Sequence, residues 1–320
     1  MQIGHFVWMN THSGKYNLCS SAVTPFDLGE LTGDSSDVLE KLAEIYGVSK
    51  EEITLTHGTQ EANFLAFASI SNRVSKAQGF LPEYEPIRAL PSVFGKSWDP
   101  IKGIDELERE SVLLISNPNN PTGNFIDNKQ LKELSAELVS KNSYAIIDSI
   151  FSEFVGLNMD LPLDNIIITS STSKFYTMKG VKLGWIIANK SSIKEIVGYA
   201  DLISPGPFDL EQKYTSIILG ERNKVRERNS GIISPNASYL LGKDWGNYVK
   251  GMPIAFIGTS CPEEGINLSE KLLGMGVVTI PGKYFGVERG LRIGLGSISN
   301  ENFKHAVELM SEVMDQCEAR

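Results

Sequence analysis

Hydrophobic positions along the chain follow two periods, one typical of helices and one typical of strands. Helical spacing runs through residues 34–46, where the apolar positions are Val38, Leu39, Leu42 and Ile45. A second helix is predicted at 128–139, and the segment that begins at Gly58 opens a third. Short apolar runs predict strands at 53–56, 111–115, 144–147, 166–169 and 183–188. This alternation of strands and helices predicts an α/β fold with a mainly parallel sheet.

Three side chains that could take part in chemistry lie at the ends of predicted strands. Asn120, Asp148 and Lys174 each follow such a strand within a few residues. Ligands of open α/β sheets bind beyond the carboxyl ends of the strands. Because the carboxyl ends of parallel strands meet at one edge, we expect these three side chains to converge there.

The pattern changes near residue 221, where we place a domain boundary. Residues 222–228 form a basic stretch with helical spacing, whereas 230–239 is rich in loop-forming residues. An amphipathic helix is predicted at 300–317. The chain contains no internal repeat and no low-complexity tract.

The composition is that of a globular protein. The 320 residues are 41% hydrophobic and 22% charged, which allows a sizeable core and argues against disorder. The net charge of −9 argues against nucleic acid or an anionic membrane as a partner, because either requires a concentrated basic face. We find no export signal at the N-terminus and no apolar run long enough to span a bilayer, so we predict a cytoplasmic protein.

The cysteines and histidines form no metal-binding pattern. Cys19, Cys261 and Cys317 are odd in number and far apart, and the four histidines lack the spacing of zinc ligands. We therefore expect a reducing compartment and no structural metal.

The sequence Ser-Thr-Ser-Lys at 171–174 is the strongest chemical signal in the chain. Lys174 follows an apolar strand, and Lys182 comes eight residues later. A lysine in this position can form a Schiff base with an aldehyde, while neighbouring hydroxyls and a second cation suit a phosphate group. These requirements together are those of pyridoxal 5′-phosphate. The alternative is an ordinary solvated lysine on a serine-rich loop.

A second motif identifies a family. Residues 117–123 read Asn-Pro-Asn-Asn-Pro-Thr-Gly directly after an apolar run. With Asp148 after a strand, then Ser-x-x-Lys and a cation eight residues on, the chain resembles the class I/II aminotransferases, which are fold type I pyridoxal phosphate enzymes. The resemblance spans nearly the whole chain. It implies a three-layer sandwich at 33–221 that binds the cofactor, and a smaller α+β domain made of 1–32 and 222–320.

The resemblance implies two catalytic residues. Lys174 would hold the cofactor and, once released, move a proton from the substrate α-carbon to the cofactor C4′. Asp148 would lie beside the pyridine nitrogen and keep it protonated, which makes the ring a better electron sink. Asn120 would contact the cofactor's phenolic oxygen and the substrate. Taken alone, Asp148 could instead be an aspartate that caps a turn at the end of a strand.

The expected phosphate site combines helix-start amides, hydroxyls and one cation. These groups belong to Gly58, Thr59, Gln60, Ser171, Ser173 and Lys182. The family usually has arginine where Lys182 stands. Lysine supplies a point charge without the two-pronged geometry of a guanidinium.

Two further residues are expected to contact the cofactor ring and the substrate. Tyr84 matches the family position whose aromatic ring stacks on the pyridine, with Phe94 as the alternative. Arg292 matches the arginine that binds the substrate α-carboxylate in a two-point contact. Arg289 is expected to face solvent, although a shift in the alignment would exchange the two arginines.

Two positions depart from the family pattern. Phe151 replaces a tyrosine whose hydroxyl usually contacts the phenolic oxygen, so we predict that the cofactor–lysine imine has a higher pKa than in a tyrosine-bearing relative. The family implies a homodimer, often with a partner tyrosine at the phosphate. Here the corresponding segment, residues 31–34, contains Thr32, a poor substitute for that tyrosine.

The sequence therefore predicts an aminotransferase that exchanges an amino group between an amino acid and a 2-oxo acid. The alternatives are a lyase or decarboxylase of the same fold, such as an amino-acid phosphate decarboxylase, and a sensor that binds the cofactor without catalysis. Acidic, aromatic and phosphorylated substrates all remain open at this stage.

Overall fold

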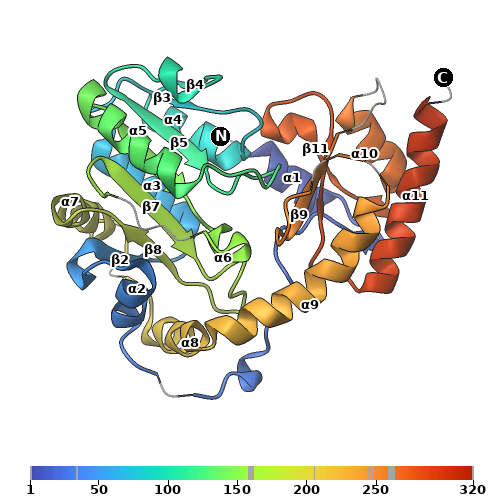
Figure 1. Cartoon of the computed structure of the whole chain (residues 1–320), viewed down its shortest axis with the longest axis horizontal. Coiled ribbons are helices and arrows are strands. Elements are labelled where there is room, and N and C mark those ends of the chain that lie inside the picture. Colours follow the sequence, from blue (N-terminus) through green and yellow to red (C-terminus); the bar gives the residue numbers. More distant parts are fainter. Residues whose placement is uncertain are drawn as a thin grey trace.

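The computed structural model shows a large sheet covered by helices and, beside it, a smaller part with two short sheets (Figure 1). It describes residues 2–33, 35–157, 162–204, 206–243, 245–246, 248–258 and 264–318, with side chains up to residue 315 in the last helix. Cys261 and the side chain of Cys317 lie outside the described part. Cys19 is a buried free thiol.

The large sheet has seven strands in the order β2-β8-β7-β6-β5-β3-β4. Their bounds are β2 Ile53–Thr56, β3 Lys76–Gly79, β4 Trp98–Pro100, β5 Ser111–Ser116, β6 Tyr144–Asp148, β7 Ile166–Ser171 and β8 Gly184–Ile187. The run from β7 to β4 is parallel, whereas β8 is antiparallel to both of its neighbours. The predicted mainly parallel sheet is therefore confirmed, and every strand predicted from an apolar run forms.

Helices cover both faces of this sheet, which gives the predicted three layers. Successive strand residues point to opposite faces, so Ile147 belongs to one hydrophobic cluster and Ile146 to the other. The first cluster includes residues of α2 (Val38–Tyr46) and α5 (Asn128–Lys141), and the second includes residues of α3 (Thr59–Ile70), α4 (Glu85–Val93) and α7 (Lys190–Ala200). The helix predicted at 34–46 begins only at Val38, because the Asp37 carboxylate accepts the backbone N–H of Leu39 and caps it there.

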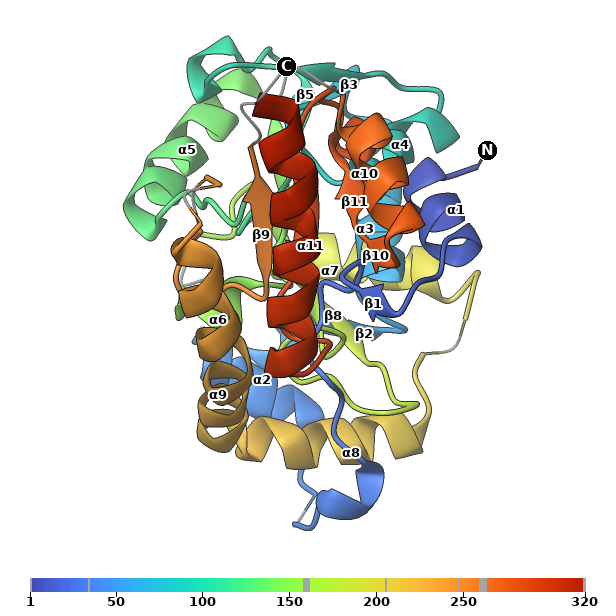
Figure 2. The ribbon, with the colours of Figure 1, turned by 90° about the vertical axis from the view of Figure 1, so that its right-hand side faces the viewer.

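The smaller part combines the two ends of the chain. Its strands are β1 Tyr16–Asn17, β9 Ile254–Ile257, β10 Val277–Val278, β11 Ile280–Pro281 and β12 Leu291–Gly294, with β11-β12-β9 antiparallel and β1 parallel to β10. Its helices are α1 Gly4–Thr11, α10 Gly265–Gly274 and α11 Asn300–Glu318, and Figure 2 shows α11 on the outside beside α10. Leu18 packs in the same cluster as Leu291 and Phe303. The predicted domain limits at 32/33 and 221/222 stay a prediction.

Helix α9 (Arg222–Leu241) corrects one prediction, because the segment 230–239 is helical and not a loop. Pro235 lies inside the helix, where it removes one backbone hydrogen bond. Ile233, Ala237 and Leu240 are nevertheless buried in the cluster of the smaller part. Burial of these side chains outweighs the weak helical propensity of the segment. The local sequence does not reveal that they are buried.

A buried ionic group ties α9 to the end of the sheet. Glu153 of α6 (Ser152–Val155) accepts hydrogen bonds from Tyr176 at 3.0 Å, Arg222 at 2.9 Å and Arg226 at 3.1 Å. Glu153 is only 8% exposed, whereas both arginines reach solvent. This carboxylate therefore joins the segment after Asp148 to the first two turns of α9, which itself follows α8 (Asp209–Gly220).

We expect Glu153→Ala to lower the free energy of unfolding by about 2 kcal/mol. The substitution leaves the buried Tyr176 hydroxyl without its partner, while the two arginines can turn to water. Urea denaturation measures the loss. Glu195→Ala is a matched control, because it breaks an exposed pair with Arg73 that is worth less than about 1 kcal/mol. Equal losses in both variants would contradict a stabilising role for Glu153.

The described residues lack two features, a membrane-spanning helix and a metal-binding cluster. None of the helices in this part of the chain is long and apolar enough to cross a membrane. Across the same described ranges, no three His, Cys, Asp or Glu side chains are grouped so that they could hold a metal ion.

Candidate active site

The sheet brings the predicted site residues to one edge. Asp148 ends β6 and Ser171 ends β7, which is parallel to it. Because β8 runs in the opposite direction, its beginning lies at this same edge, and Gly184 pairs with both Ser171 and Thr56. This reversal places Lys182, just before β8, beside the segment that follows β2.

A cavity of about 220 Å³ lies at this edge. Its lining consists of Phe6, Ser21, Thr59, Gln60, Tyr84, Ser116, Asn120, Asp148, Ile150, Phe151, Ser171, Ser173, Lys174 and Lys182. All predicted site residues line it except Gly58 and Arg292, which contact residues that do. The sequence did not indicate Phe6, Ser21, Ser116 or Ile150. These four have side chains without a motif, and only the folded chain brings them to the cavity.

One end of the cavity is suited to an anion. The Thr59 hydroxyl donates to Ser171 Oγ at 2.8 Å, which in turn donates to Ser173 Oγ at 3.0 Å. Helix α3 begins here at Gly58 without a side-chain cap, so its first N–H groups are available to an acceptor. Gly58 has φ +105°, and a Cβ there would come within 2.9 Å of the Lys182 side chain. Glycine thus lets the lysine lie directly over the start of the helix.

Lys174 is a partly buried lysine at the cavity. Removal from water lowers its pKa to about 8, with a further contribution from the positive charge of Arg292, while Asp148 acts in the opposite direction. The lowered pKa gives this lysine more of the neutral amine near neutral pH than an ordinary lysine has. A neutral amine is the form that attacks an aldehyde carbon.

Asp148 is buried between the sheet and α3. Asn63 donates to its Oδ2 at 3.0 Å, and the backbone N–H of Ile150 donates to its Oδ1 at 3.2 Å. The Asn63 side chain is itself fixed by the Thr169 hydroxyl at 2.6 Å. Burial raises the pKa of Asp148 to about 6. Asn63 was not predicted from its sequence context, although a lone asparagine in the apolar run of α3 is a usable signal.

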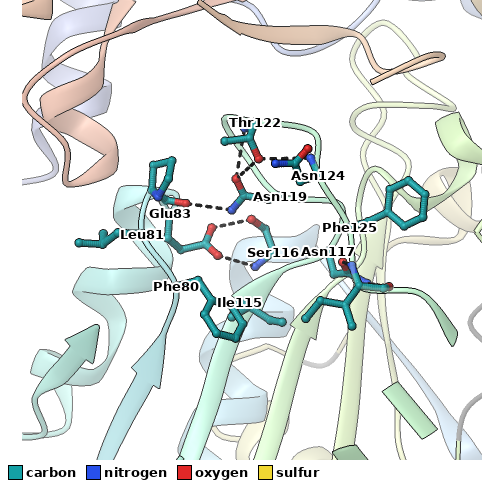
Figure 3. A pocket seen from close by; sticks show the side chains of 12 residues that line it. Phe80, Leu81, Glu83, Ile115, Ser116, Asn117, Asn119, Thr122, Asn124 and Phe125 are labelled. Carbon is teal, nitrogen blue, oxygen red and sulfur yellow. Dashed lines mark hydrogen bonds between the residues drawn. The ribbon is translucent and has the colours of Figure 1, made fainter. Parts of the chain in front are cut away.

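The loop that carries Asn120 is fixed by a buried carboxylate. Glu83 accepts hydrogen bonds from the hydroxyl and backbone N–H of Ser116 at 2.5 and 2.9 Å, and from the Tyr84 N–H at 2.7 Å. Ser116 Oγ also accepts the N–H of Asn120 at 2.9 Å. Figure 3 shows Glu83 and Ser116 facing each other in the wall of a second cavity, of about 240 Å³. One carboxylate thus couples the positions of Tyr84 and Asn120.

Arg292 on β12 lies beside the cavity and contacts its wall from the smaller part. It is 1% exposed and donates to Asn120 Oδ1 at 3.3 Å and to the backbone carbonyl of Cys19. Its Nε is buried and has no hydrogen-bond partner among the described residues. Burial lowers the pKa of Arg292 to about 10, which leaves it cationic at neutral pH. Arg289 is exposed, as expected.

Of the three aromatic residues considered for the cofactor ring, Tyr84 and Phe151 line the cavity and Phe94 does not. Tyr84 lines the cavity, and Gln60 Nε2 donates to its hydroxyl at 3.4 Å. Phe94 packs against Phe64 and Phe67, each with ring centroids 5.2 Å apart, so its ring belongs to the helical layer. Phe151 lines the cavity with a ring that carries no hydroxyl and is only 1% exposed.

These side chains fit pyridoxal phosphate. The cavity offers a nucleophilic amine, a carboxylate for a ring nitrogen, a cradle of hydroxyls with one cation for a phosphate, and an arginine with an unpartnered donor. The fold and the cavity together define a fold type I pyridoxal phosphate enzyme.

Comparison with known proteins identifies the family. The sequence pattern of the family described as aminotransferase class I and II matches residues 31–310, and the chain belongs to that family. An aspartate aminotransferase from Thermococcus kodakarensis is 24% identical over 293 residues, which are 82% of this chain and 78% of that protein. Histidinol-phosphate aminotransferase 2 from Carboxydothermus hydrogenoformans is 25% identical over 310 residues, 88% of this chain and 83% of that protein.

The fold agrees with this family. A crystal structure of a pyridoxal phosphate-dependent aminotransferase from Streptococcus suis matches with a TM-score of 0.87 at 21% identity, covering 99% of this chain and 98% of that one. The cofactor of this chain is pyridoxal phosphate, and the chain is a transferase. The roles of individual site residues stay predictions.

Proposed function

We propose that the protein transfers an amino group between an amino acid and a 2-oxo acid. The observation that carries this proposal is the single cavity that holds Lys174, Asp148 and Asn120, with Arg292 hydrogen-bonded to Asn120. When bound, pyridoxal phosphate supplies an electron sink for the α-carbon of the amino acid. Membership of the aminotransferase family supports the same reaction.

Each side chain has a separate role in the proposed reaction. The amine of Lys174 holds the cofactor and moves the proton that leaves the substrate α-carbon. Asp148 keeps a proton on the ring nitrogen through its negative charge. The guanidinium of Arg292 and the amide of Asn120 bind the α-carboxylate, which fixes the direction of the bond that breaks. Lys182, the three hydroxyls and the start of α3 hold the phosphate.

Mixing the holoenzyme with single amino acids tests the proposal. Transamination converts the bound cofactor to its pyridoxamine form and releases a 2-oxo acid, both in stoichiometric amounts. Release of carbon dioxide or of a side-chain group would identify a decarboxylase or lyase instead. Absence of any spectral change across all amino acids would overturn an enzymatic role and favour a sensor.

Phe151→Tyr is expected to lower the midpoint pH of the holoenzyme's spectral titration by about one to two units. The new hydroxyl can donate a hydrogen bond to the phenolic oxygen of the cofactor, which stabilises the deprotonated chromophore. Absorbance measured from about pH 5 to about pH 10 gives the titration midpoint of the wild type and of the variant. A midpoint that is unchanged or higher in the tyrosine variant would refute the role given to position 151.

We also infer that the protein is a homodimer. The segment around the start of α8 exposes four large apolar side chains close together in sequence, Leu202, Ile203, Phe208 and Leu210, which are 83%, 57%, 75% and 59% exposed. Exposed apolar side chains of this size favour burial against another copy. Light scattering of wild type and of Leu202→Glu/Phe208→Glu tests this, and we expect the variant to be monomeric. A monomeric wild type would contradict it. The cytoplasmic location stays a prediction.

A further inference from the structure

Helix α1 supplies part of the cavity wall from the far N-terminus. Phe6 lines the cavity. Glu85, at the start of α4, fixes this helix by accepting the backbone N–H groups of Gly4 at 3.0 Å and His5 at 2.5 Å. Trp8 holds the other side through a buried hydrogen bond of 2.8 Å from Nε1 to a backbone carbonyl. Figures 1 and 2 show α1 beside α4. Phe6 is 39% exposed, and this anchored helix holds its ring in the wall of the cavity.

The cavity wall includes aromatic and aliphatic side chains. The ring of Phe6 lies 6.4 Å from that of Tyr84 at 81°, an edge-to-face arrangement. Ile150 and Phe151 line the same cavity. Some polar side chains in the lining, such as Ser21, have not been assigned a contact with the cofactor. These side chains carry no charge.

The basic group of α1 is kept neutral. His5 is 2% exposed, and its ring lies 5.3 Å from that of Tyr84. Burial lowers the pKa of His5 to about 2, and the positive charges of Arg292 and Lys174 act in the same direction. At neutral pH the imidazole can therefore offer a hydrogen bond, since Nδ1 has no partner among the described residues. It cannot offer a positive charge.

Every cation at the cavity already has a partner in the proposed reaction. Lys174 takes the aldehyde, Lys182 the phosphate, and Arg292 the α-carboxylate. Among the described residues that line the cavity, no further lysine or arginine is present. A second carboxylate or a phosphate on the substrate side chain would lie against apolar side chains without a counter-charge from the described residues, which is unfavourable.

We propose, on the basis of the transamination proposed above, that the enzyme selects amino acids with uncharged apolar side chains, aromatic ones first. Phe6 on α1 is the residue that determines this selection. The preference differs from the acidic and phosphorylated substrates for which the two relatives described above are named.

The half-reaction of the holoenzyme with L-phenylalanine, L-leucine, L-aspartate, L-glutamate and O-phospho-L-serine tests the proposal. We expect the second-order rate constant for phenylalanine to exceed that for aspartate at least about tenfold, a modest ratio for a missing counter-charge. A preference for an acidic or phosphorylated amino acid, as a cation from a partner subunit would produce, overturns this inference and leaves transamination standing. Absence of reaction with these five overturns the apolar preference, and only absence of reaction with every amino acid overturns transamination as well.

The variant Phe6→Arg tests the residue itself. A guanidinium at this place supplies the missing counter-charge, so we expect the ratio of aspartate to phenylalanine rate constants to rise at least about tenfold. Val7→Arg is the matched control, because Val7 lies on the same short helix, is about as exposed as Phe6 (36% against 39%) and does not line the cavity. Cofactor absorbance and circular dichroism check that both variants fold. An equal change in the two variants overturns the role of Phe6.

Discussion

Replacing Lys174 with alanine is expected to lower the rate of amino-group transfer at least about 10⁴-fold, because one amine performs two tasks. The variant loses the covalent attachment of the cofactor and the base that moves the substrate proton. Borohydride treatment followed by peptide mapping provides a second readout. Wild type should yield a labelled peptide that contains Lys174, and the variant should yield none.

Lys182→Ala is the matched control for this experiment. It removes a lysine from the same cavity but from the anion end, next to Gly58. We expect this variant to bind the cofactor more weakly and still to be labelled at Lys174. Labelling at Lys182 in wild type, or a normal rate in Lys174→Ala, would exclude Lys174 as the attachment site.

Replacing Asp148 with asparagine is expected to slow the half-reaction roughly 10²- to 10⁴-fold. The carboxylate is buried, and loss of one partner from a buried ion pair costs about 3–5 kcal/mol, which converts to a factor of this size. Asn63 donates to Asp148 Oδ2, so an amide at position 148 would turn its oxygen to Asn63 and its NH₂ toward the ring nitrogen. A donor facing that nitrogen disfavours its protonation, and the ring becomes a poorer electron sink.

Single-turnover rates with one amino acid measure this effect, and cofactor absorbance shows whether the variant remains loaded. Asn63→Ala serves as a comparison, because it removes only one hydrogen bond to the carboxylate. Its rate should fall by about tenfold or less. A rate for Asp148→Asn within about threefold of wild type would contradict the proposed contact with the ring nitrogen.

The parts of the fold that the sequence predicted are those with strong local signals. The apolar runs that became β5 and β7 are buried along their whole length, and β6 is buried after its first residue, Tyr144. Their hydrophobicity marks these strands before any tertiary contact is known. Strand β3 was missed because Lys-Ala-Gln-Gly has no such run and is held by its neighbours on both sides. The helical structure of 230–239 in α9 was not predicted for the same reason. It depends on packing against residues that are far away in the sequence.

The site residues also differ in whether a local sequence signal predicts them. Lys174, Asp148 and Asn120 could be found because each follows a strand and belongs to a motif. Phe6 and Asn63 carry no motif, and their place at the cavity depends on contacts with residues far away in sequence. The reversed direction of β8, which brings Lys182 to the anion end, also depends on the pairing of β8 with β7 and with β2, which no local pattern encodes.

Helix α9 has a consequence for how the molecule comes apart. Val225 in its second turn packs with the core under the large sheet, while Ile233, Ala237 and Leu240 pack with the core of the smaller part. One helix thus contributes side chains to both hydrophobic cores. When heat or denaturant unfolds one core, the other loses the packing of α9, so we expect the chain to unfold in one cooperative transition and not in two separate steps.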